Sequence, residues 1–155
     1  MPTLTSAMLA DMEPLTGSLL DELAPMFVSH HAEIRCPWPL DVDYGKLIAG
    51  YKLGILRAFV LRDEDGAPLG YALYTVSGLP FSVGTRHAVE EALYVDPSAR
   101  GGAGGYPTLS RVASAWLKSE GVAWVHRHAP VGSRYERIVE SAGSARAYTV
   151  FLEKV

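Results

Sequence analysis

Cysteine is nearly absent from this chain of 155 residues, which contains only Cys36. A single thiol can form no internal disulfide, and there is no second thiolate to share a structural zinc ion with it. Because disulfides are typical of oxidising compartments, their absence favours a cytoplasmic protein. We expect Cys36 to be a small buried hydrophobic residue.

Long apolar runs are also lacking. No stretch approaches the ~18 uninterrupted apolar residues of a membrane-spanning helix, and the first residues lack the basic flank and apolar core of a signal peptide. We therefore expect a soluble protein with no membrane partner. A length of 155 residues is typical of one domain and allows a sizeable buried core, so we expect a single domain over residues 1–155.

Positive charge is too sparse for duplex nucleic-acid binding. The chain has 14 Lys and Arg against 17 Asp and Glu, with no dense basic stripe, so we expect no nucleic-acid partner. Residues 1–50 hold seven acids against two bases, whereas residues 101–155 hold four acids against seven bases. This gradient fits a protein that handles a cation with its first part and a polyanion with its last, or charges scattered over a solvated surface.

Hydrophobic periodicity predicts interleaved helices and strands, hence an α/β fold with a mixed sheet. The predicted helices are Gly17–Ile34, Asp43–Leu53, Thr108–Ser119 and Ser133–Ala142, the last with Ser133 as its N-cap. The predicted strands are Ser6–Met12, Arg57–Arg62, Pro68–Val76, His87–Val95, Val122–His128 and Ala147–Leu152. Gly66 closes a tight turn between the second and third strands, and a Gly/Pro-rich connection is expected over Ser77–Thr85.

The stretch from Leu93 to Gly105 carries the clearest signal of function. It reads Leu-Tyr-Val-Asp-Pro-Ser-Ala-Arg-Gly-Gly-Ala-Gly-Gly and places a glycine run between a strand and a helix. Glycines let the main chain approach a ligand closely, and the N–H groups at a helix N-terminus attract anions. The pattern predicts a site for a phosphate or pyrophosphate group. The alternative is an ordinary glycine-rich loop without a ligand.

Two familiar nucleotide motifs fit this stretch poorly. A P-loop needs Lys followed by Ser or Thr directly after its last glycine, where this chain has Tyr106 and Pro107. A dinucleotide fold places its glycine motif in the first strand–helix unit, whereas here it comes late in the chain. Neither family therefore explains the motif.

The stretch instead resembles the GNAT acyltransferases. Their coenzyme A pyrophosphate loop reads R/Q-x-x-G-x-G/A and follows a strand that ends in L-x-V, with proline two residues later. Arg100 and Gly105 match the ends of that loop, and Leu93, Val95 and Pro97 match its approach. The run from His30 to Ile34 is similar to an H-x-x-E-I run in small phage and bacterial members, and the predicted elements follow GNAT order along most of the chain.

The resemblance implies a central, mostly antiparallel sheet flanked by helices, and acetyl-CoA as the cofactor. The residues it implies for coenzyme binding are Leu93, Tyr94, Val95, Arg100, Gly101, Gly102, Ala103, Gly104 and Gly105. Two positions depart from the family pattern. Ala103 stands where the first loop glycine is usual, and Val139 stands where many members have the tyrosine that protonates the leaving thiolate. Tyr135, one helical turn earlier, is the candidate replacement.

The activity that the resemblance implies is direct transfer of an acetyl group to an amine, which must first lose a proton. Glu91 is the first candidate for the base, because we expect it to share a strand face with Leu93 and Val95; Glu90 and His87 are the second candidates. A main-chain N–H near Val95 would hold the oxyanion. The acceptor would be a small-molecule or peptide amine, in a site shaped by the acidic N-terminal half. The alternative is a catalytically inactive module that binds coenzyme A or a protein.

Several further residues leave two interpretations open. His30, His31 and Glu33 would line the acceptor site or bind a metal, or would only be solvated or cap the helix. His126 and His128 lie on one face of their predicted strand but lack a third ligand, so we expect no metal site. Trp38 and Trp116 are expected in the core.

Overall fold

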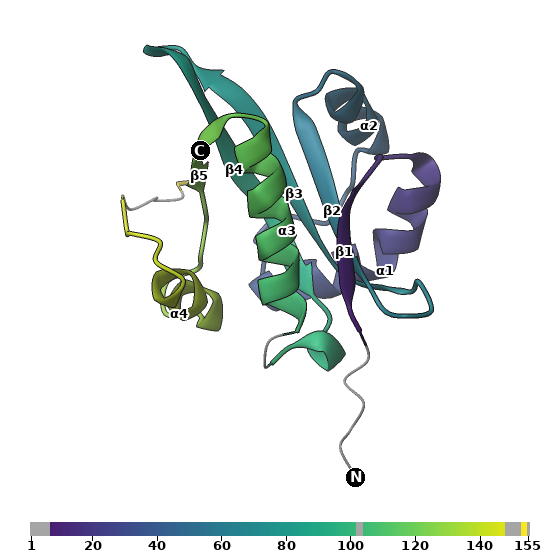
Figure 1. Cartoon of the computed structure of the whole chain (residues 1–155). Helices are drawn as coiled ribbons and strands as arrows, with labels where there is room; N and C mark the ends of the chain where they lie inside the picture. The colour runs from purple at the N-terminus through teal and green to yellow at the C-terminus, as the bar shows by residue number, and fades with distance from the viewer. Residues whose placement is uncertain (1–6, 102–103, 148–152, 155) are drawn as a thin grey trace.

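The computed structural model describes residues 7–101, 104–147 and 153–154. Its centre is a five-stranded sheet in the order β1-β2-β3-β4-β5 (Figure 1). The strands are β1 (Leu9–Glu13), β2 (Leu56–Arg62), β3 (Pro68–Leu79), β4 (Ser82–Val95) and β5 (Val122–His126). Neighbouring strands are antiparallel except β4 and β5, which are parallel. The expected mixed, mostly antiparallel sheet is confirmed.

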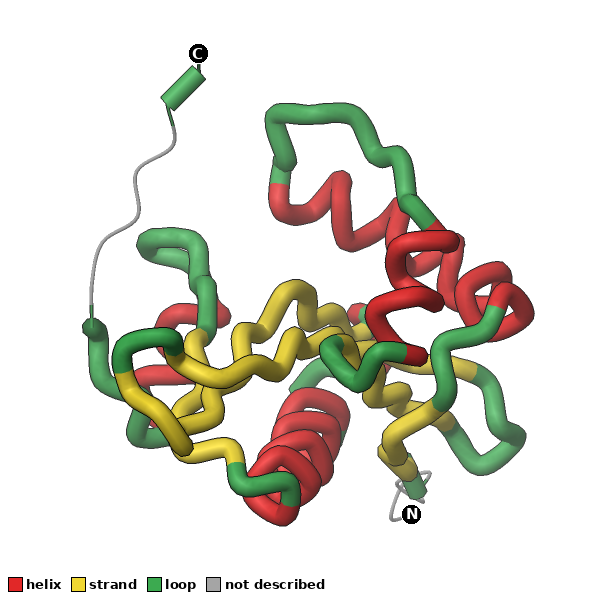
Figure 2. Tube along the Cα trace, turned by 90° about the horizontal axis from the view of Figure 1, so that it is seen from above, coloured by secondary structure: helices red, strands yellow, loops and turns green. Residues whose placement is uncertain are grey.

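Helices cover both faces of this sheet, as the view along it shows (Figure 2). The helices α1 (Gly17–Ile34) and α2 (Tyr44–Lys52) pack on one face, and α3 (Gly105–Ser119) packs on the other. A short 3-10 helix, η1 (Pro97–Ala99), lies between β4 and α3, and α4 (Arg134–Ser141) follows β5. We call the two sides of the sheet the α1 face and the α3 face. Among the described residues, no helix combines the length and the apolar character needed to cross a membrane.

Most predicted helices match the structure because their ends carry local capping signals. The side chains of Thr16, Asp43 and Ser133 accept hydrogen bonds from the first turns of α1, α2 and α4. One helix start was predicted incorrectly. The helix expected from Thr108 begins three residues earlier at Gly105, because glycine and Pro107 are tolerated in a first helical turn.

The β strands depart further from the prediction. The connection expected over Ser77–Thr85 is wrong, because β3 and β4 run through it as one long hairpin with its turn between Leu79 and Ser82. The pairing of two strands overrides the weak β propensity of their glycines. β5 ends at His126 rather than His128. Ser6 and most of the last predicted strand, residues 148–152, lie outside the described residues.

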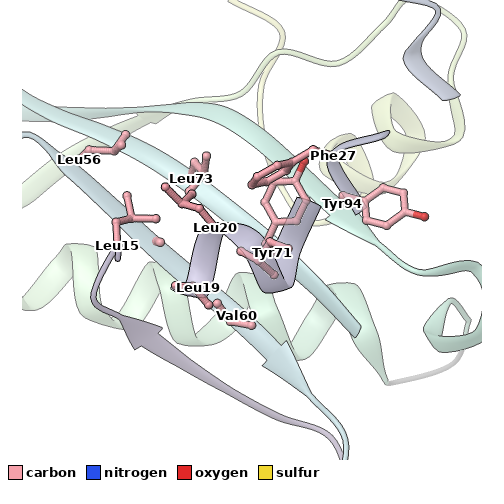
Figure 3. Packing of buried hydrophobic residues seen from close by; sticks show 11 residues of the cluster. Leu15, Leu19, Leu20, Phe27, Leu56, Val60, Tyr71, Leu73 and Tyr94 are labelled. Carbon is pink, nitrogen blue, oxygen red and sulfur yellow. The ribbon is translucent and has the colours of Figure 1, made fainter. Parts of the chain in front are cut away.

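The core on the α1 face joins α1 to the middle of the sheet (Figure 3). Leu20 and Leu23 of α1 are fully buried, and the ring of Phe27 meets that of Tyr71 edge to face at 5.1 Å. Such a contact adds specific geometry to the burial of both rings. The core therefore fixes the last turns of α1 over β3, beside the C-terminal half of β4.

β4 contains a β-bulge at Glu91. Leu73 of β3 pairs with Ala92, and the next residue, Tyr74, pairs with Glu90, so that Glu91 is the extra residue. An inserted residue reverses the alternation of side chains beyond it. Glu90 consequently lies with Tyr74 on the α3 face, while Ala92 packs on the α1 face.

The bulge overturns one expectation about the candidate base. Leu93 and Val95 pack into the core on the α3 face, whereas Ala92 and Tyr94 pack into the core on the α1 face. Glu91 lines a pocket on the α1 face together with Ala92. The prediction that Glu91 shares a face with Leu93 and Val95 is therefore wrong, because strict alternation does not continue through the bulge.

Candidate active site

A pocket of about 360 Å³ opens on the α1 face, where α1, α2 and β4 meet. Side chains from α1, from the segment between the two helices, from α2, and from β3 and β4 form its walls. The residues are Phe27, His30, His31, Ile34, Cys36, Trp38, Leu40, Val42, Leu47, Tyr71, Leu73, Glu91 and Ala92. The structure thus brings Glu91 together with His30 and His31 from the first helix.

Glu91 is exposed and held by its neighbour on β3. The hydroxyl of Thr75 donates to Oε1 of Glu91 over 2.6 Å. His87 lies nearer the start of β4. Its Nε2 is 2.9 Å from Oγ of Ser77, and its Nδ1 is 3.3 Å from Nε2 of His126. A carboxylate at the pocket wall can accept a proton from an amine directly or through water.

His30 is packed into the wall of this pocket. Its Nδ1 forms a hydrogen bond of 2.7 Å with the hydroxyl of Tyr71, and its ring lies against Tyr94 with centroids 5.4 Å apart. Burial lowers the pKa of His30 below its usual value near 6.5, although the nearby Glu33 opposes the shift. His30 is therefore neutral at pH 7.

Arg100 begins the glycine-rich loop and is anchored on both sides. Its Nε donates to the carbonyl of Val95 over 2.7 Å, and its Nη2 donates to Glu33 over 2.6 Å. The hydrogen bond that it donates to Glu33 raises the pKa of the guanidinium, which also lies over the ring of Tyr94 at 5.4 Å. These contacts tie the loop to the end of β4 and to α1.

The glycines after Arg100 bring α3 close to β4. A Cβ on Gly105 would stand 2.5 Å from Cγ1 of Val95 and 2.6 Å from the carbonyl oxygen of Ala99, so no larger residue fits without movement. Gly101 has a φ of 107°, a conformation that favours glycine. Gly102 and Ala103, two of the predicted coenzyme-binding residues, lie outside the described residues. Gly104 is the N-cap of α3, so the free N–H groups of the helix begin at the end of β4.

A groove of about 370 Å³ runs between α3 and α4 from this helix N-terminus. It is lined by Tyr106, Pro107, Ser110, Arg111, Ser114, Ile138, Ser141 and Ala142. The ring of Tyr106 meets that of Tyr135 at 5.7 Å. Arg111, several hydroxyls and the positive end of a helix give this groove the character of an anion site.

Glu90 is a residue of β4 on the α3 face, and it is only 4% exposed. The hydroxyl of Tyr74 donates to its Oε2 over 2.8 Å, and Arg127 and the hydroxyl of Tyr135 donate to the same carboxylate. The Arg127 side chain is itself 12% exposed. Glu90, the second candidate for a base, thus forms a buried ion pair that joins β4 to the chain beyond β5 and to α4.

Arg127 was not predicted as a site residue. The only local signal was a charged residue following an apolar strand. Its partner Glu90 lies 37 residues earlier in the chain, and a single sequence does not show which two strand ends meet.

Tyr135 keeps its proton over the whole neutral range. Burial, together with the neighbouring Glu90, raises the pKa of its hydroxyl well above the ordinary value of 10. Val139, in the position of the family tyrosine, is buried. The structure therefore places Tyr135 beside Glu90, close to where β4 and β5 separate, and leaves Val139 as a packing residue.

The gap exists because β4 and β5 separate. Their pairing runs from Arg86 with Val122 to Val89 with His126, after which β4 continues to Val95 without a partner in the described part of β5. An unpaired strand edge presents main-chain N–H and C=O groups to a ligand. Glu90 lies at the start of this free edge and the glycine-rich loop lies at its end.

Several acids of the N-terminal region bind other groups and do not line the pocket. Glu13 and Glu22 both bind Arg62, and Glu33 binds Arg100. The side chain of Asp43 caps α2. Glu91 is the only carboxylate among the described lining residues, so the expectation that the acidic N-terminal half shapes this site is not met by the pocket.

Three apolar side chains differ from the expectations. Trp38 is 58% exposed and lines the pocket instead of lying in the core, because the Pro-flanked segment lies outside the helices. Trp116 packs, half-buried, against the core on the α3 face, and Cys36 is half-buried. Within residues 7–101, 104–147 and 153–154, no three His, Cys, Asp or Glu side chains form a metal-binding group.

Comparison with known proteins finds similar folds among solved structures. No protein-family model and no curated protein matches the chain in sequence. A ribosomal-protein-alanine N-acetyltransferase from Brucella melitensis biovar Abortus 2308 superposes with a TM-score of 0.72 at 18% identity, covering 96% of this chain and 99% of that one. An aminoglycoside acetyltransferase from an uncultured soil metagenomic sample, solved with sisomicin, gives 0.77 at 16% identity, covering 96% and 95%.

A third similar structure is AAC(6')-Iy in complex with the bisubstrate analogue CoA-S-monomethyl-acetylneamine. It gives a TM-score of 0.68 at 15% identity and covers 94% of this chain and 97% of that one. The chain has the GNAT acetyltransferase fold. Likeness at these identities establishes the GNAT fold and not the acceptor, since one fold hosts many activities.

Proposed function

We propose that this protein is an acetyl-CoA-dependent N-acetyltransferase. The observation that carries the proposal is the meeting of two sites at the bulge of β4. Glu91 lines the pocket on the α1 face, while Glu90 binds Tyr135 beside the groove on the α3 face. A donor in the groove and an amine in the pocket would therefore reach the same free strand edge.

The residues of the groove fit coenzyme A. The N-terminus of α3 and the loop from Arg100 to Gly105 would hold the pyrophosphate, with Arg111 as a further cation. Leu93, Tyr94 and Val95 form the strand end at which the pantetheine arm would lie, and the free edge of β4 offers it main-chain hydrogen bonds. When bound, acetyl-CoA supplies an activated acetyl thioester.

Glu91 would act as the general base. The ammonium of an acceptor loses one proton to the carboxylate, directly or through water, and the neutral nitrogen adds to the thioester carbon. The C–S bond then breaks, and the second proton that the nitrogen loses passes to water. An alkylamine has a reference pKa near 10.4, so proton removal limits the fraction of reactive amine at pH 7. A main-chain N–H on the free edge of β4, near Val95, would stabilise the oxyanion.

Tyr135 would return a proton to the leaving thiolate. Its raised pKa keeps the hydroxyl protonated, and a rotation away from Glu90 would free it to donate. A thiol has a reference pKa near 8.5, so this donation assists departure without being essential. Glu90 and Arg127 would position Tyr135 rather than act on the substrate.

The test combines acetyl-CoA binding with amine acetylation. Calorimetric titration should show binding of acetyl-CoA but not of ATP or NAD, and Arg100→Glu should weaken it by tenfold or more. With a panel of primary amines, Glu91→Gln should lower kcat at pH 7 by roughly 100-fold, because general-base catalysis typically contributes at least that factor, and should leave coenzyme affinity unchanged.

The control is Glu120→Gln, an equivalent change at an exposed position at the end of α3. The deficit of Glu91→Gln should shrink at high pH, where the free amine no longer needs a base. Wild-type turnover of Glu91→Gln at every pH would exclude Glu91 as the base. Coenzyme binding without transfer to any amine would instead favour an inactive coenzyme-binding module.

A further inference from the structure

The lining of the pocket on the α1 face indicates which amines it would accept. Apolar side chains surround the space: Phe27 and Ile34 from α1, Trp38 and Leu40 from the connecting segment, Leu47 from α2 and Leu73 from β3. A volume of about 360 Å³ is at the lower end of the range for small-molecule sites, roughly 300–1,000 Å³. The pocket thus suits a small and largely apolar molecule.

The described lining of the pocket has one carboxylate, and it lies on β4. Glu91 is the only carboxylate among the described residues that line the pocket. His30 is neutral at pH 7 because burial lowers its pKa, and Nε2 of His31 donates to the carbonyl of Trp38 over 2.7 Å. One fixed negative charge faces the space, at the edge of β4 where transfer would take place.

Three acids lie close in sequence to lining residues of the pocket but do not line it themselves, and one of them, Asp41, is exposed between Leu40 and Val42. Glu33 of α1 forms an ion pair with Arg100, and Asp43 accepts a hydrogen bond from the N–H of Lys46 at the start of α2. A second cationic centre on the ligand would therefore lie against the apolar wall. Removing an unpaired charge from water is costly, so a polycation would bind poorly.

We propose that the acceptor is a small primary amine with a single cationic centre, joined by a short chain to an apolar and preferably aromatic group. The ammonium binds Glu91, and the apolar group packs among Phe27, Trp38 and Leu47. This proposal rests on the proposed function for the acetyl transfer itself, but the selectivity of binding does not depend on transfer. The proposed acceptor differs from the aminoglycoside compounds with which two of the similar structures were solved.

The experiment measures binding of three probes by calorimetry, with and without coenzyme A. The probes are 2-phenylethylamine, its neutral counterpart 2-phenylethanol, and the polycation spermidine. We expect 2-phenylethylamine to bind at least tenfold more tightly than either of the others. Glu91→Gln should abolish its advantage over 2-phenylethanol, while Glu120→Gln should keep it.

A second variant tests the apolar wall by a gain of affinity. Leu47→Glu places a second carboxylate in the pocket lining, on α2, and should bring the affinity for spermidine to or above that for 2-phenylethylamine. Thermal unfolding of each variant, followed by circular dichroism, establishes that it is folded. Because the expected change is a gain, loss of folding cannot imitate it.

Acetylation with acetyl-CoA separates this proposal from the proposed function. Selective binding of 2-phenylethylamine without its acetylation would support the pocket assignment and contradict the proposed activity. Acetylation of spermidine or of sisomicin in preference to 2-phenylethylamine would overturn the pocket assignment while supporting the activity. Equal binding of the three probes would also overturn it.

Discussion

Glu90 and Glu91 are adjacent in the chain, but their side chains lie on opposite faces of the sheet. Glu90 is 4% exposed and accepts hydrogen bonds from Arg127 and two tyrosines, whereas Glu91 is exposed at the wall of a pocket. The carboxylate of Glu90 is buried and already accepts from these three donors, so it is closed to a substrate amine. The two environments separate the structural role of Glu90 from the role as base that we propose for Glu91.

Replacing Glu90 should test the structural role. Glu90→Leu leaves Arg127 buried and unpaired, and we expect the free energy of unfolding to fall by about 3–5 kcal/mol, the usual cost of removing one partner of a buried ion pair. Urea denaturation measures it. Glu91→Leu, the matched change one residue along, should cost less than about 1 kcal/mol. Equal stability of the two variants would contradict the assignment.

At the scale of elements, the site depends on the close approach of α3 to the end of β4. Gly105 begins the helix with Val95 and Ala99 too near to admit a Cβ. The loop that precedes it is held by Arg100, which binds the Val95 carbonyl and Glu33 of α1. The helix N-terminus therefore meets the strand end at a set place, as an anion site requires.

Gly105→Ala should disturb this junction. The added Cβ must displace the main chain of Ala99 or the side chain of Val95, so we expect a loss of about 1–3 kcal/mol in unfolding free energy, typical of overpacking. Acetyl-CoA affinity should fall as well. Gly17→Ala, in the first turn of α1 with open space around its Cβ, is the control and should be neutral or slightly stabilising. Calorimetry and urea denaturation give both quantities, and an unchanged Gly105→Ala would refute the close-contact argument.

At the scale of the whole molecule, one sheet separates two sites that communicate at a single strand. Helices cover both faces of the sheet (Figure 2). The pocket lies on the face covered by α1 and α2, and the groove lies between α3 and α4. β4 reaches both because its bulge turns neighbouring side chains to opposite faces and because β5 leaves its edge free. In the proposed function, these layers would keep the acetyl donor and the acceptor apart except at that edge.

His30 connects α1 to both central strands and should make global stability depend on pH. Its pKa is lowered by burial, so between the folded pKa and the unfolded value near 6.5 the unfolded chain binds more protons. The contribution of His30 is thus fully present above pH 6.5 and is lost as pH falls through the folded pKa. Urea midpoints at pH 7.5 and 5.5 should differ less in His30→Gln than in the wild type. An identical difference in both proteins would show that His30 does not carry this effect.

The sequence by itself determined most of the helices and marked the glycine-rich loop. Capping residues and helical periodicity mark α1, α2 and α4, and the glycine run after Arg100 indicates an anion site. These signals are local, because a cap or a hydrophobic face depends on residues within a few positions of one another.

Only the tertiary structure decided which side chains meet. The bulge at Glu91 depends on the register of β4 against β3, and no residue type within β4 predicts it. Glu90 meets Arg127 across 37 positions, and Arg100 meets Glu33 across 67. Trp38 lines the pocket because the packing of α1 and α2 leaves its segment outside the core. Such contacts follow from strand pairing and helix packing over long sequence separations, so periodicity along the chain does not specify them.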